Sequence, residues 1–152
     1  MRAGLTYLPF IDPNYPKPLA VLDDGPPLLV VKGKLETLAQ PLIAIVGARN
    51  ATVNGRKFAK MIAADLAKAG LTVISGMARG IDGAAHDGAL SAGTTVAVLA
   101  GGTDVLYPPE HRDLYELIAA QGAVISEMRP APNPSLICSR GATASSPALA
   151  AG

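Results

Sequence analysis

An arginine stands in the loop after the first long apolar run of the sequence. Apolar residues at 42–46 end at Gly47, and Arg49 follows shortly after. A glycine permits a tight exit from a strand, and a helix that begins after the loop offers free backbone N–H groups at its positive end. A guanidinium beside such a helix end is suited to holding a phosphate. The alternative interpretation is a solvated surface arginine.

A second loop follows the next apolar run and contains Ser75, Gly76, Arg79 and Gly80. Its two glycines, four residues apart, bracket a short turn into a helix. Backbone N–H groups that converge in such a turn form a cradle for an oxyanion. The spacing matches neither the dinucleotide-binding fingerprint nor the P-loop. The pattern therefore predicts anion binding without identifying a nucleotide cofactor.

Two polar residues, Asp82 and His86, lie at positions i and i+4 of the helix expected after this loop. That spacing places them on one helix face, where their side chains can touch. One interpretation is a polar pair at the ligand edge. The other, which we favour, is a structural aspartate that caps the helix and orients a buried histidine.

Two further loops follow apolar runs. Gly101 and Gly102 would let a ligand or another part of the backbone approach closely, and Asp104 would accept from a hydroxyl or cap the turn. Tyr107 precedes a proline, which restricts it to extended geometry and favours packing over stacking. Glu127 follows the last apolar run; it could be catalytic, or it could pair with one of the loop arginines.

No residue pattern indicates a catalytic nucleophile, a metal centre or a cofactor. The single cysteine, Cys138, lies in a stretch rich in proline and serine with no helix end to lower its pKa. Two histidines leave little for a metal site, and one cysteine excludes a disulfide framework.

The elements that must position these loops alternate regularly along the chain. Continuous apolar runs that end at glycines or polar residues are typical of strands covered on both faces, as in a parallel sheet. The pattern predicts an α/β, Rossmann-like three-layer fold with a parallel central sheet, although it does not give the strand order. We expect strands at 42–46, 71–74, 95–99 and 123–126, and helices at 54–69, 81–91 and 109–121.

The helical segments carry apolar residues at helical spacing. In the first helix these are Phe58, Ile62, Leu66 and Ala69, and in the third we expect Leu114, Leu117 and Ile118 to face inward. Residues 1–40 form an irregular lead segment with a short strand at 28–31 and one or two helical turns at 34–40.

Composition narrows the function classes. Of the 152 residues, 49% are hydrophobic and 16% charged, which excludes wholesale disorder. A net charge of +1 excludes a strongly basic DNA-coating protein but not a local basic patch. Aromatic residues make up only 4%, which disfavours an aromatic-stacking single-strand-binding module. No apolar run approaches 18 residues and the N-terminus lacks a signal core, so we expect a cytoplasmic protein with no membrane segment.

The motifs taken together resemble the DNA-processing protein A family, called DprA or Smf, from about residue 7 to residue 130. The resemblance rests on five segments in order: 15–33, Gly47-Ala48-Arg49, 75–86, 95–108 and Ile125-Ser126-Glu127. It implies a bacterial protein without catalytic activity that binds single-stranded DNA during natural transformation. It also implies that the protein protects this DNA, loads the RecA recombinase and works as a homodimer. Arg49 matches the family arginine that contacts DNA phosphates.

The sequence departs from the family after Glu127. There the family continues into Phe-Pro-x-Arg-Asn-Arg and then Ile-x-Gly-Leu-Ser, whereas this chain reads differently from 134 to its end. Read one base out of register from the third base of codon 136, the tail can encode Asp-Leu-Phe-Pro-Arg-Arg-Asn-Arg-Leu-Ile-Ser-Gly-Leu-Ser. Our hypothesis is that a frameshift replaced the residues from about 136 onward.

We therefore divide the chain into a lead segment at 1–40, a Rossmann-like DNA-binding core at 41–130 and a non-family tail at 131–152. We expect the tail to be disordered beyond Asn133. We also expect the loss of later strands and of the dimer surface, an exposed sheet edge and low stability.

An enzymatic alternative is a nucleotide phosphoribohydrolase of the related group that resembles lysine decarboxylase. That group carries Pro-Gly-Gly-x-Gly-Thr-x-x-Glu, whereas residues 100–104 here read Ala-Gly-Gly-Thr-Asp. Glu127 is the only loop carboxylate that could substitute for the missing glutamate. A nicotinamide-dependent dehydrogenase is weaker still, because its glycine fingerprint is missing.

Overall fold

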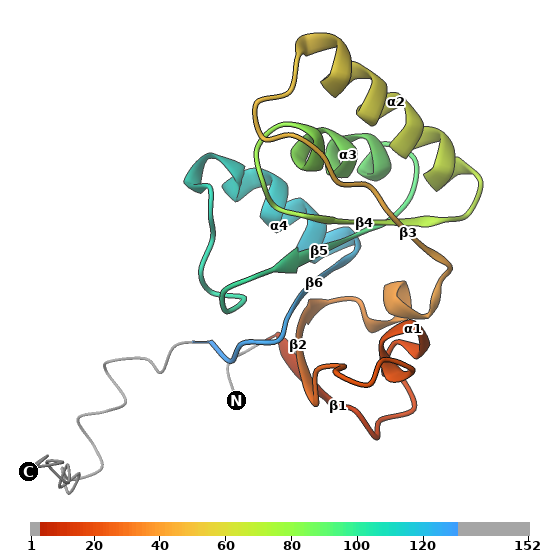
Figure 1. Cartoon of the computed structure of the whole chain (residues 1–152), viewed down its shortest axis with the longest axis vertical. Helices are drawn as coiled ribbons and strands as arrows, with labels where there is room; N and C mark the ends of the chain where they lie inside the picture. Colours follow the sequence, from red (N-terminus) through yellow and green to blue (C-terminus); the bar gives the residue numbers. More distant parts are fainter. Residues whose placement is uncertain (1–3, 131–152) are drawn as a thin grey trace, which may run out of the picture.

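A six-stranded sheet in the order β1-β2-β6-β5-β4-β3 forms the centre of the fold (Figure 1). The structure is a computed structural model that describes residues 4–130. The strands are β1 (Leu5–Pro9), β2 (Leu28–Gly33), β3 (Leu42–Ala44), β4 (Thr72–Gly76), β5 (Thr95–Leu99) and β6 (Ala123–Ser126). The helices are α1 (Lys17–Ala20), α2 (Val53–Lys68), α3 (Ile81–Leu90) and α4 (Arg112–Gln121), with short 3-10 turns η1 (Leu35–Ala39) and η2 (Pro109–His111).

The four strands from β3 to β6 are parallel, as their continuous apolar runs predict. The two strands of the lead segment make the sheet mixed. β2 pairs antiparallel with β6, with Val31 opposite Ile125, and β1 adds an antiparallel hairpin strand at the edge. β1 was not expected from the sequence, because it is short, only partly buried and ends at Pro9. A proline is tolerated at such an edge position.

Helices α2, α3 and α4 cover one face of the sheet (Figure 1). Each right-handed crossover moves the chain one strand in the same direction, so all three helices lie on the same side. Ala97 and Val124 pack under α4 on this face. Val96 and Ile125 point to the other face, which the lead segment with α1 and η1 covers. The sheet thus has a packed layer on each side.

Two helices bury different side chains than the sequence suggested. In α2 the buried residues are Ala59, Ala63 and Ala67, whereas the side chain of Phe58 is 60% exposed. Small residues are needed there because a Cβ at Gly88 of α3 would lie only 2.1 Å from the carbonyl oxygen of Lys60. The backbones of α2 and α3 therefore approach closely.

In α4, Tyr115 and Ile118 are buried as the inner face, while Leu117 is 49% exposed, contrary to the expectation. The hydroxyl of Tyr115 donates to the carbonyl of Thr103, which satisfies its polar end inside the core. Tyr115 therefore takes the place on the inner face of α4 that the spacing of apolar residues had indicated for Leu117.

The edges of the sheet are β1 and β3. Strand β3 ends at Ala44, two residues earlier than expected, although the backbone N–H of Ile45 still donates to the carbonyl of Ile74. The expected non-family tail at 131–152 lies outside the described residues. Between residues 4 and 130, no helix has the length and apolar character needed to cross a bilayer.

Candidate functional site

Three of the four predicted loops meet at one groove of about 460 Å³ at the carboxyl ends of β3, β4 and β5. This is the edge at which an open parallel sheet binds ligands. Of the predicted site residues, the groove is lined by Arg49, Gly76, Arg79, Asp82 and Gly101. The remaining lining comes from Asn50, Met77, Ala78, Val98, Leu99, Ala100, Val105 and Tyr107.

The loop after β3 is pressed against the start of α3. A Cβ at Gly47 would lie 2.7–2.9 Å from side-chain atoms of Ile81, so no larger residue fits. The backbone N–H of Ile81 donates to the carbonyl of Ala48. Gly80, just before the helix, has φ +82°, and a Cβ there would lie 2.2 Å from that same carbonyl oxygen. Glycines at 47 and 80 therefore let the two loops that carry Arg49 and Arg79 meet.

A buried carboxylate connects the same two loops. Asp82 is 7% exposed, and its Oδ1 accepts from the backbone N–H of Gly47 at 3.3 Å. Burial raises the pKa of this carboxyl, and hydrogen bonds from the N–H groups of Gly47 and Ala78 oppose the rise. A Cβ at Gly76 would lie 2.8 Å from Asp82 Oδ2, so the end of β4 also depends on a glycine.

The two loop arginines differ in their surroundings. Arg49 is exposed at the groove. Arg79 is also exposed, but its Nε lies 2.5 Å from Oε1 of Glu110 in η2. The Arg79 guanidinium holds the pKa of Glu110 below its usual range. Glu110 was not recognised from the sequence, because 31 residues separate it from its partner.

Ser75 and His86 lie inside the fold. The hydroxyl of Ser75 is buried and donates to the carbonyl of Ile45 at 2.5 Å, which joins β4 to the segment after β3. The ring of His86 is fully buried, with Nε2 3.1 Å from the carbonyl oxygen of Gly76 and Nδ1 2.8 Å from Oγ1 of Thr95. Burial lowers the pKa of His86 to about 4. The histidine is therefore neutral at physiological pH.

The expected contact between Asp82 and His86 is replaced by other partners. Asp82 binds the loop backbone at Gly47, whereas His86 lies deeper, against Thr95 of β5 and Gly76 of β4. A shared helix face makes contact possible, but the two side chains have different hydrogen-bond partners, the N–H of Gly47 for Asp82 and Thr95 with the Gly76 carbonyl for His86. The histidine is buried, as the structural interpretation expected. The roles expected for Asp82 are not found, because α3 has no side-chain cap and the partners of His86 are Thr95 and Gly76.

The two glycines of the loop after β5 differ in their accessibility. Gly101 lines the groove, but Gly102 is buried, and a Cβ there would lie 2.6 Å from Oδ1 of Asp104. The close approach at Gly102 is therefore made by the chain itself. Asp104 is exposed next to it. Tyr107, for which packing was favoured over stacking, is 67% exposed and lines the groove.

Glu127 lies apart from the groove. It borders a separate apolar groove of about 290 Å³ on the face of the sheet that the lead segment covers, together with Leu19, Ile74 and Ile125. Burial raises the pKa of Tyr15, and the negative charge of Glu127 adds to this rise. The alternative of an ion pair with Arg49 or Arg79 is not the arrangement found, because Glu127 borders this apolar groove beside Pro16 and Pro18 of the lead segment. The loop carboxylate required by the hydrolase alternative is thus missing from the candidate site.

Residues 6–137 match the sequence model of the protein family described as DNA recombination-mediator protein A. The chain belongs to the DNA recombination-mediator protein A family. Protein Smf from Synechocystis is 43% identical to it over 121 residues, which cover 76% of this chain and 30% of the Synechocystis protein. The family assignment agrees with the resemblance carried by the glycine and arginine motifs.

Two solved structures of this family share the fold. DNA processing protein A from Streptococcus pneumoniae superposes with a TM-score of 0.79 at 36% identity, over 87% of this chain and 47% of that one. The protein from Helicobacter pylori, which binds single-stranded DNA, superposes with a TM-score of 0.75 at 30% identity, over 86% of this chain and 58% of that one. The chain therefore spans about half the length of these relatives.

Proposed function

We propose that this chain binds single-stranded DNA in the groove at the carboxyl ends of β3, β4 and β5. The observation that carries the proposal is the exposed guanidinium of Arg49 on a groove that a second exposed arginine, Arg79, also lines. The carboxylate in the same lining, Asp82, is buried. Membership of a family with a DNA-binding member supports it.

The groove offers both contacts that an unpaired strand needs. Arg49 supplies a fixed positive charge for a phosphate, and Arg79 supplies a second one once Glu110 releases it. Both members of that ion pair are more than half exposed, so exchanging Glu110 for a phosphate costs little. Val105 and Tyr107 give exposed apolar surface on which a base can rest.

The roles of the whole protein follow as parts of the proposal. We propose that the protein protects incoming DNA during natural transformation, passes it to the RecA recombinase, forms homodimers and works in the cytoplasm. We propose that it acts by binding rather than catalysis; in support, Glu127, which the hydrolase alternative needs, borders the apolar groove and is not part of the candidate-site lining. Incubation with nucleoside monophosphates should accordingly release no free base.

The binding site is tested by fluorescence anisotropy with a labelled oligothymidylate. Arg49→Ala should weaken binding about tenfold or more, because a charged hydrogen bond contributes about 1.5–3 kcal/mol. It should also reduce the salt slope by about 0.7. Lys17→Ala is the matched control, since it removes one exposed positive charge on α1, across the sheet from α2–α4. Equal binding by parent and Arg49→Ala, with both folded, would remove Arg49 from the site.

A further inference from the structure

A second groove, of about 450 Å³, runs between α2 and α3. Three of its lining residues are cations from little more than one turn of α2: Arg56, Lys57 and Lys60. Residues three and four apart on a helix are neighbours, so these charges gather along one side of the groove. The rest of the lining is Val53, Gly80, Gly83, Ala84, Asp87 and His111.

Small residues bring the two walls of this groove together. Figure 1 shows α2 and α3 side by side, and the contact of Gly88 with the Lys60 carbonyl sets their close approach. At the start of α2, the Thr52 hydroxyl accepts from the N–H of Gly55 at 3.0 Å, which fixes where the helix begins. The cations therefore stand on a rigid helix next to the first turns of α3.

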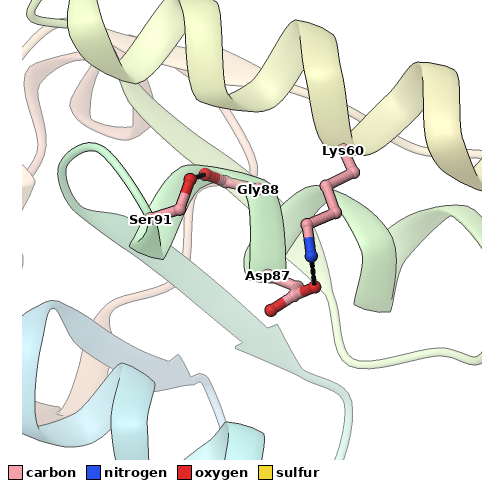
Figure 2. Close-up of polar contacts among 4 residues, drawn as sticks. All are labelled: Lys60, Asp87, Gly88 and Ser91. Carbon is pink, nitrogen blue, oxygen red and sulfur yellow. Dashed lines mark hydrogen bonds and ion pairs between the residues drawn. The ribbon is translucent and has the colours of Figure 1, made fainter.

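One of the three cations is held by a carboxylate across the groove. Figure 2 shows Lys60 of α2 reaching to Asp87 of α3, with Nζ and Oδ2 2.5 Å apart. Both side chains are more than half exposed, so this pair is easily exchanged for another anion. Arg56 donates to the carbonyl of Ala51 through Nη1 and keeps its other donors available. Within residues 4–130, Lys57 makes no ion pair.

The second groove is continuous with the candidate site. Consecutive residues of one loop line the two grooves: Arg79 the first and Gly80 the second. The ion pair of Arg79 with Glu110 lies at this junction, next to His111, which lines the second groove. A strand that leaves the first groove over this loop therefore meets the cations of α2.

We infer that the groove between α2 and α3 is a second phosphate-binding site, which holds the backbone of the same DNA strand beyond the first groove. The inference rests on the proposed function. Three cations against the single carboxylate of Asp87 favour a polyanion, and the small residues of the floor leave room for a sugar–phosphate backbone. Asp87 acts as a counter-charge that phosphate displaces from Lys60.

The inference is tested by salt-dependent binding of short and long oligothymidylates, of about five and about twenty nucleotides. Lys57→Gln should lower affinity for the long oligonucleotide by about threefold to tenfold and reduce its salt slope by about 0.7, with little effect on the short one. Lys68→Gln is the matched control, because it removes the same charge at the far end of α2, where Lys68 pairs with Asp65. Equal losses for both variants would show a general charge effect and overturn the inference.

A variant that is expected to bind more tightly provides a second test of the inference. Asp87→Asn removes the counter-charge and frees Lys60, so affinity for the long oligonucleotide should rise and its salt slope should steepen. If Lys57→Gln and Asp87→Asn both bind the long oligonucleotide as the parent does, the second site is excluded while the first stands. If the parent itself binds neither oligonucleotide, the proposed function fails instead.

Discussion

The buried carboxylate of Asp82 accepts a hydrogen bond from the backbone N–H of Gly47, with 3.3 Å between Oδ1 and N. This contact joins the first turn of α3 to the loop after β3, although 35 positions separate the two residues in the chain. Asp82 of α3 therefore positions the loop that carries Arg49, and the geometry of this loop depends on the Asp82 carboxylate.

Replacing Asp82 separates its role as acceptor from its charge. Asp82→Asn keeps an oxygen for the Gly47 N–H and removes a buried charge, whose cost is seen in the raised pKa. We expect its stability to equal or exceed that of the parent in urea unfolding. Asp82→Ala leaves the N–H without its partner and should lose about 1–3 kcal/mol. Equal destabilisation by both variants would show that the negative charge itself is required.

His86 makes stability depend on pH. Its pKa is about 4 in the folded protein and about 6.5 in an unfolded chain, so between these values only the unfolded chain takes up the proton. Stability should therefore fall as the pH drops from 6.5 to 4, by on the order of 3 kcal/mol. The raised pKa of Asp82 acts with the opposite sign, so unfolding is best followed in the Asp82→Asn background.

The same point has a direct spectroscopic check. The imidazole C–H signal of His86 in an NMR titration of the folded protein should stay unchanged from pH 8 down to about 5. A midpoint near 6.5 would show that the ring is not held neutral by burial and would contradict the placement of His86 against Thr95.

Two glycines with nearly equal φ angles differ in their surroundings. Gly70 (φ +86°) has open space where a Cβ would lie, whereas at Gly80 (φ +82°) the Cβ would meet the Ala48 carbonyl at 2.2 Å. Gly70→Ala should cost about 1–2 kcal/mol for the backbone angle alone. Gly80→Ala must also displace the loop, so we expect a loss above about 3 kcal/mol and weaker DNA binding. Similar unfolding midpoints for the two variants would contradict the loop contact.

The coding DNA tests the origin of the tail. The family match extends to residue 137, next to codon 136, at which we place the change of reading frame. Sequencing across codons 130–152 should reveal a neighbouring frame that encodes Phe-Pro-Arg-Arg-Asn-Arg. The hypothesis is lost if no one-base shift in this region restores that motif.

The pattern of apolar residues along the chain was sufficient to predict the parallel strands of the sheet. The apolar runs at 95–99 and 123–126 coincide with β5 and β6, because strands buried on both faces need continuous apolar residues. The inner face of α2 was missed for the opposite reason. Its large apolar residue, Phe58, is exposed, while the close packing against α3 selects alanine at positions that a search for bulky residues passes over.

The loops of the candidate site could be predicted from the sequence, but the contacts between their side chains could not. Glycines and an arginine after strands indicated the groove, since the carboxyl ends of parallel strands share one edge. The contact of Arg79 with Glu110 depends on how η2 packs against the loop after β4, which no local spacing reports. Glu127 was placed wrongly because its side depends on the path of the chain after β6.

The most direct test of the central claim is to locate the bound strand. An oligothymidylate that carries 4-thiothymidine is crosslinked to the protein by light, and the attached peptides are identified by mass spectrometry. We predict crosslinks within residues 49–50, 76–82 and 99–107, the segments that carry the groove-lining residues. Crosslinks confined to the lead segment, or to the apolar groove beside Glu127, would contradict the account.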